Sequence, residues 1–179
     1  MTSTSAWPPL GIRSLEVQLN TLTEAVRNPP GSRTDDEHIW LTRFLLLRAF
    51  GYLEQVFFEC YREHIWHKSY GTVRNFSSSY LSKSQNPTVD NLLNALGRLD
   101  LSLRQEFEDW IDEDDQSLRR ALSFAVDRRH KIAHGHNEGV GEKRVLELVS
   151  ILESVADWII RKLNPHPEAR PSRQIVHNE

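Results

Sequence analysis

The sequence predicts an all-α protein, an antiparallel bundle of five to six helices. Apolar residues recur every three to four positions along most of the chain, which is the spacing of one face of a helix. Proline- and glycine-containing segments, such as Asn28–Ser32 and Gly135–Gly141, separate these stretches. No stretch shows the alternation of a strand or the signal of a hairpin, so no sheet is expected.

The composition is that of one globular domain. The 179 residues are enough to bury a hydrophobic core, and 39% hydrophobic with 26% charged residues argue against global disorder. The single cysteine, Cys60, excludes a disulfide framework and suits a reducing cytoplasm, where we expect the protein to act. The first 20 residues lack a signal-peptide pattern. The most apolar segment, Phe44–Phe58, contains Arg48 and Glu54 and is too short to span a bilayer, so no membrane association is expected.

The N-terminal region, residues 1–34, is predicted to be a loose arm followed by a short helix. This helix spans Ser14–Arg27, where leucine and valine recur at helical spacing, and Asn28–Ser32 ends it. A long helix is expected to begin at Asp35, because carboxylates complement the free N–H groups of a first helical turn. Between Phe44 and Phe58 this helix is apolar nearly all round, which indicates burial on several sides or a contact between subunits.

Shorter helices complete a bundle predicted over residues 35–164. The Ser-rich segment Val73–Lys83 forms a weak helix, and Asn86–Thr88 caps the next helix. A capping box at Ser102–Gln105 is expected to open a further one. After Asn86–Thr88 the sequence predicts four helices, Val89–Leu99, Ser102–Ile111, Ser117–His134 and Glu142–Leu163. Prolines then end the last helix, and residues 165–179 are expected to be a disordered tail.

Charge is concentrated in two neighbouring segments, although the net charge is only −3. Residues 106–115 hold seven acids and no base, whereas residues 119–131 hold five bases and one acid. The other residues sum to zero. The chain is therefore no generally basic nucleic-acid binder, but it carries one basic strip beside an acidic one.

The basic strip leads into the most informative segment of the chain, Asp127–Gly135, which reads DRRHKIAHG. On a helical wheel Arg129 falls near the centre of an apolar arc, where a guanidinium needs a carboxylate, a phosphate or water. Pairing with an acid such as Glu54 would make this arginine structural. His134 lies about 140° around the helix and about 7.5 Å along it from Arg129. Two copies of the helix across a two-fold axis would bring both residue types to one cleft.

In this setting Arg129 and His134 resemble the signature of HEPN domains, in which a polar residue follows the arginine and a small residue precedes the histidine. His130 takes the place where the family most often has asparagine. The resemblance is to the RiboL-PSP type of HEPN protein, and it covers residues 38–164. Two segments carry it, Phe44–Ile65 and Phe107–Gly135.

The resemblance implies a homodimer that cleaves RNA as a metal-independent endoribonuclease without a cofactor. It assigns proton transfer to His134, phosphate binding in the transition state to Arg129 and an auxiliary role to His130, with Arg128 and Lys131 as RNA contacts. Attack by the RNA 2′-OH would leave a 2′,3′-cyclic phosphate and a 5′-OH. The setting implied is toxin–antitoxin or antiviral defence, with a separate antitoxin or regulatory protein. The alternative is a non-catalytic HEPN module for dimerisation or RNA binding.

Other groups of reactive side chains have simpler interpretations. His130, His134 and His136 have a spacing that can bind zinc, but the chain has no HExxH motif and no evident carboxylate ligand, so no metal site is predicted. Cys60 lies among aromatic residues, which indicates a buried structural thiol. Four tryptophans are expected in the core or an interface rather than in a base-stacking platform: Trp40, Trp66, Trp110 and Trp158.

Overall fold

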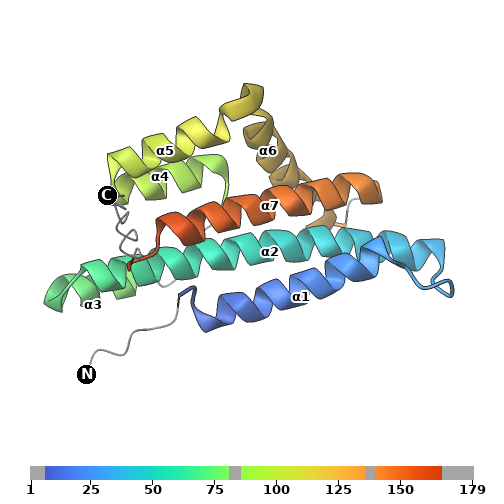
Figure 1. The fold of residues 1–179 in the computed structure, drawn as a ribbon, viewed down its shortest axis with the longest axis horizontal. Coiled ribbons are helices and arrows are strands. Elements are labelled where there is room, and N and C mark those ends of the chain that lie inside the picture. The colour runs from blue at the N-terminus through green and yellow to red at the C-terminus, as the bar shows by residue number, and fades with distance from the viewer. Residues whose placement is uncertain (1–6, 81–85, 136–139, 167–179) are drawn as a thin grey trace, which may run out of the picture.

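The computed structural model describes residues 7–80, 86–135 and 140–166, and within these ranges the chain forms seven helices and no strand (Figure 1). The helices are α1 (Leu10–Arg27), α2 (Asp35–Lys68), α3 (Gly71–Tyr80), α4 (Val89–Leu99), α5 (Leu101–Ile111), α6 (Glu113–Ala133) and α7 (Glu142–Lys162). The all-α prediction is confirmed. The described ranges hold seven helices, which is more than a bundle of five to six, but each of them corresponds to a helix predicted individually from the sequence, with the weak Val73–Lys83 helix found as α3. Most of the expected tail, residues 167–179, lies outside the described residues.

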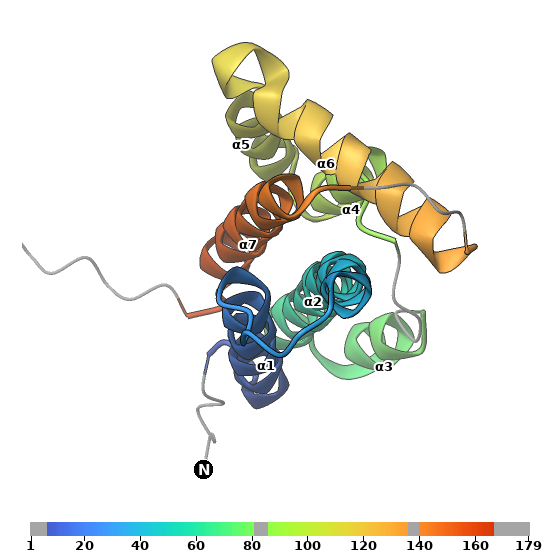
Figure 2. The same ribbon diagram turned by 90° about the vertical axis from the view of Figure 1, so that its right-hand side faces the viewer.

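The central helix is α2, and α1 and α7 pack along it on its left in Figure 2. α1 runs antiparallel to α2, but α7 runs parallel to it (Figure 1). His38 near the start of α2 bonds Glu142 at the start of α7, and His64 near the end of α2 bonds the carbonyl of Leu163. The prediction of an antiparallel bundle is therefore wrong for this pair. The excursion through α3, α4, α5 and α6 returns the chain to the beginning of α2 before α7 starts.

One hydrophobic core joins α2 and α7 to the shorter helices. The largest fully buried side chains on α2 and α7 are Leu45, Leu46, Phe50, Leu53, Leu148 and Leu152. On the other side of α7, Phe107 meets Trp158 edge-on at 4.8 Å between ring centroids, and Trp110 stacks on Trp158 at 5.9 Å. By contrast, Trp40 and Trp66 are 66% and 42% exposed, so the core contains neither of them.

The N-terminal caps of α2 and α5 differ in how well the sequence predicts them. A capping box opens α2: Glu37 donates its backbone N–H to the Thr34 hydroxyl at 3.3 Å, and its carboxylate accepts the Thr34 N–H at 2.8 Å. This confirms the expected start at residue 35. The capping box expected at Ser102–Gln105 is wrong, because Asp100 is the N-cap of α5 and accepts the Ser102 N–H at 2.7 Å. Within the described residues no helix is both long enough and apolar enough to cross a membrane.

The acidic residues at the start of α6 form a turn rather than a regular helix. Residues 114–116 have φ of 49°, 57° and 60°, which is the left-handed region. The right-handed helix therefore begins near Ser117, as the sequence predicts. Asp112 accepts two N–H groups of Arg119, at 2.6 and 3.0 Å, and these bonds hold the pKa of that carboxyl below its usual range. The turn and this ion pair fix the direction in which α6 crosses the bundle.

Candidate functional site

The predicted catalytic motif lies at the C-terminal end of α6, to the right of α2 in Figure 2. His134 follows the last helical residue, and its backbone N–H still donates to the carbonyl of His130 at 3.1 Å. Gly135 then donates to the carbonyl of Ile132 at 3.0 Å with φ of +77°, a conformation that favours glycine. The chain turns away at this point, so the His134 side chain stays exposed at the helix end.

Arg129 lies against the central helix. Its guanidinium carbon is 5.4 Å from the centroid of the Phe50 ring, which is fully buried on α2. The side chain itself is half-buried. The contact that the structure records for this guanidinium is thus an aromatic ring, not the carboxylate of Glu54 that a structural role would require. Arg129 therefore lies half-buried at the edge of the core, with its guanidinium beside a buried aromatic ring.

The two histidines of the motif lie together on the other side of the helix. The rings of His130 and His134 meet edge-on, with centroids 4.3 Å apart. No contact between Arg129 and His134 is recorded among the described residues, in agreement with their 140° separation on the wheel. One chain therefore brings two of the three predicted catalytic residues together, and the third points toward α2.

The predicted RNA contacts, Arg128 and Lys131, share one acidic neighbour. Asp127 lies 3.3 Å from Lys131 Nζ and 3.9 Å from Arg128 Nε. The guanidinium of Arg128 also lies over the ring of Phe124, 4.8 Å from its centroid. Both cations are partly exposed, so they remain accessible while Asp127 keeps them on one side of α6.

Two further arginines are not among the predicted site residues. Arg144, in the first turn of α7, lies 5.3 Å from the centroid of the Phe124 ring, pairs with Glu147 at 3.0 Å and lines a cavity of about 450 Å³ between α6 and α7. Arg43 stands seven residues before Phe50 on α2, which is two turns, nearly the same face and about 10.5 Å along the axis. The seven-residue spacing in the sequence could therefore have indicated that Arg43 lies on the same face of α2 as Phe50. Nothing in the sequence pairs Arg144 with Phe124, because a loop separates their helices.

The other reactive side chains, the histidines with zinc-binding spacing and Cys60, do not form a second site among the described residues. The part of the chain that the structure describes contains no group of three side chains able to hold a metal ion, and His136 lies outside that part. Cys60 is buried, and burial raises the pKa of its thiol to about 12, which confirms a structural thiol. His64 is affected in the opposite direction, since burial lowers the pKa of its imidazole. Its Nδ1 bonds the carbonyl of Leu163.

Comparison with known proteins identifies the family of the chain. The family model described as RiboL-PSP-HEPN matches residues 12–164. This range begins within α1 and ends just beyond α7, so it includes all seven helices of the described ranges. Comparison with curated proteins and with solved structures gives no significant match.

Proposed function

The chain belongs to the RiboL-PSP-HEPN family, and from this premise we propose that it is a metal-independent endoribonuclease. The observation that carries the proposal is the motif at the end of α6: His134 is exposed at a helix end, and Arg129 lies five residues before it, half-buried against Phe50. A HEPN-type domain with both residues in place has the two side chains that RNA cleavage needs.

The chemistry uses groups that RNA and this chain supply. The 2′-OH attacks the adjacent phosphorus while its proton passes to a base, and the bond from phosphorus to the 5′-oxygen breaks as that oxygen receives a proton. His134 transfers protons, because an imidazole nitrogen can both accept and donate a proton. Arg129 binds the non-bridging oxygens as they gain charge. His130, in contact with His134, orients the phosphate or shares the proton transfer. The products are a 2′,3′-cyclic phosphate and a 5′-OH.

The proposed active unit is a homodimer. Within one chain Arg129 and His134 diverge, so a cleft with both side chains needs the motif of a second copy. The exposed aromatic residues at the start of α2, Trp40 and Phe44, give an apolar surface for such a contact. Arg128, Lys131 and the newly located Arg144 add positive charge for RNA around the motif. We propose a defence or toxin–antitoxin setting, in which a separate protein restrains the nuclease.

End-group analysis tests the function. Purified protein is incubated with end-labelled RNA in excess EDTA, beside the same RNA carrying 2′-O-methyl groups. We expect cleavage in EDTA with cyclic-phosphate ends, and no cleavage at methylated positions, because the methyl group removes the nucleophile. A zinc site at the histidines predicts the opposite, inactivation by EDTA and rescue by zinc. A non-catalytic module predicts a gel shift with no new ends under either condition.

A further inference from the structure

The corner between α2 and α3 combines exposed aromatic residues with a local absence of acids. Residues 64–89 contain three Lys or Arg residues and no Asp or Glu. Within this segment Trp66 is 42% exposed, Tyr70 78% and Phe76 66%. Monomeric proteins bury most side chains of this size, so exposed Trp66 and Tyr70, which share contacts with Arg74, form a distinct apolar surface. Lys68 and Arg74 add positive charge to it and the nearest acid on α2 is Glu63, beside His67, so the charge of the segment favours an anionic partner with flat apolar groups.

Arg74 organises this surface. Its guanidinium carbon lies 4.5 Å from the centroid of the Trp66 ring and 5.3 Å from that of Tyr70. Nε of Arg74 donates to the carbonyl of Ser69 at 3.0 Å, which fixes the arginine between the end of α2 and the start of α3. The two rings and the guanidinium plane thus form a pre-arranged set of flat faces. Unpaired nucleic-acid bases stack on such faces regardless of sequence.

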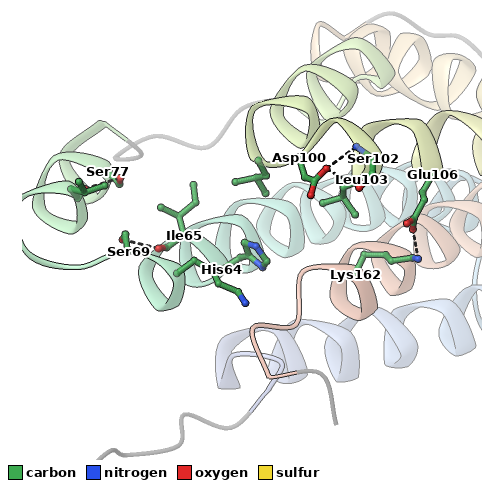
Figure 3. A pocket seen from close by; sticks show the side chains of 12 residues that line it. His64, Ile65, Ser69, Ser77, Asp100, Ser102, Leu103, Glu106 and Lys162 are labelled. Atoms are coloured by element: carbon green, nitrogen blue, oxygen red, sulfur yellow. Dashed lines mark hydrogen bonds and ion pairs between the residues drawn. The ribbon is translucent and has the colours of Figure 1, made fainter. Parts of the chain in front are cut away.

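A cavity of about 630 Å³ adjoins the corner (Figure 3). Lys68, Val73 and Ser77 line it from α2 and α3. The two acids on its far side are already engaged: Asp100 accepts from Ser102, and Glu106 is paired with Lys162 (Figure 3). The wall nearest the aromatic surface therefore offers a cation and a hydroxyl group, which suits a sugar–phosphate backbone that continues past stacked bases.

We propose that Trp66, Tyr70 and Arg74 form a platform on which unpaired bases of single-stranded RNA stack, with Lys68 contacting the backbone. The proposal rests on the proposed function, since that RNA is the substrate of the site at Arg129. It replaces the expectation that Trp66 belongs to the core or an interface. It also assigns the substrate class: RNA that is single-stranded over several nucleotides beside the cut.

The platform and the catalytic motif are arranged for one strand to reach both. Trp66 follows Phe50, the neighbour of Arg129, by 16 residues on α2, which is about 24 Å along the axis. In Figure 2, α3 and the C-terminal end of α6 both lie on the right of α2, away from α1 and α7. At a stacked spacing of about 3.4 Å, about seven nucleotides span this distance. A trinucleotide is too short to occupy both places at once.

Binding is measured first, in the His134→Ala background so that the RNA stays intact. Fluorescence anisotropy with labelled single-stranded RNA of about 15 nucleotides compares Tyr70→Ala, Tyr70→Phe and Arg74→Ala. We expect the alanine variants to bind about tenfold more weakly, whereas Tyr70→Phe keeps the affinity because it keeps the ring. Arg27→Ala, an exposed arginine on α1, is the control for loss of charge. Equal affinity of Tyr70→Ala and its background would overturn the proposal.

Cleavage then separates the platform from the catalytic site. In the otherwise unaltered protein, Tyr70→Ala should raise KM for an RNA of about 15 nucleotides and leave cleavage of a trinucleotide unchanged. Equal losses on both substrates, or none on either, contradict the platform but leave the proposed nuclease intact. Absence of any cleavage contradicts the nuclease, and the binding measurement still decides the platform. If Tyr70→Ala alters only the oligomeric state in light scattering, the surface is a protein interface and the proposal fails.

Discussion

Replacing Arg129 with alanine separates a catalytic from a structural role. The structural contribution follows from one recorded contact, the guanidinium over Phe50 at 5.4 Å. At a half-buried position such a contact is worth about 0.5–2 kcal/mol. For a chain of this size that corresponds to a loss of about 1–8 °C in Tm. Removal of one transition-state donor, in contrast, costs about 10²–10³-fold in kcat. The two interpretations differ widely in the ratio of activity lost to stability lost.

The assay pairs thermal melting by circular dichroism with single-turnover cleavage of labelled RNA well below the Tm. Arg129→Lys is the informative companion, because lysine keeps a cation over Phe50 but lacks the paired N–H donors for phosphate. We expect Arg129→Lys to melt like the wild type and to remain strongly impaired in cleavage. Arg27→Ala on α1 serves as a matched surface control. Full activity of Arg129→Ala would refute the assigned role, and a large Tm loss that accounts for the lost activity would make the arginine structural.

Two other perturbations test the assembly and the acidic turn. Light scattering should show a dimer of the wild-type chain at micromolar concentration and a monomer for Phe44→Glu. Phe44 is 49% exposed in the single chain, and a carboxylate at this position cannot be buried unpaired in a dimer contact. A monomeric wild type would contradict the two-fold site. In urea unfolding, Arg119→Ala should be less stable than the wild type at pH 7, because the arginine holds the pKa of Asp112 below its unfolded value. That stabilisation is present above about pH 4 and is lost as the pH falls through the lowered pKa, so a difference that persisted undiminished at low pH would contradict it.

The positions of most helices follow from local rules, which is why the sequence predicts them. Apolar spacing and acidic first turns are encoded within a few residues, as at the start of α2 and near Ser117. The cap at Ser102 fails for an equally local reason: Asp100 is a stronger acceptor and lies two residues earlier. The parallel course of α2 and α7 is not local, because it depends on how far α3 to α6 carry the chain before it returns.

For the candidate site, too, local arrangements could be predicted from the sequence and contacts between distant segments could not. The wheel places His130 and His134 on one face and Arg129 on another, and the ring contact at 4.3 Å agrees with it. The partner of Arg129 could not be predicted, since Phe50 lies on a helix 79 positions earlier in the chain. Trp66 shows the opposite case: its large apolar side chain predicts burial, but it lies near the end of α2 and is 42% exposed.

The length of α2 has a consequence for how the molecule loses its structure. This helix of 34 residues contacts α1, α3, α6 and α7, so most of the buried apolar surface has α2 on one side of it. The helices packed on α2 cannot separate from it without exposing part of its buried surface, whereas α4 and α5 pack mainly on each other and on α6. Opening near the middle of α2 thus requires loss of its contacts with α1, α6 and α7 together, and backbone amides there should be among the slowest to exchange with solvent. α3 packs mainly on α2, so it can open while the rest of the bundle stays closed, and the platform proposed at Arg74 would be lost with it.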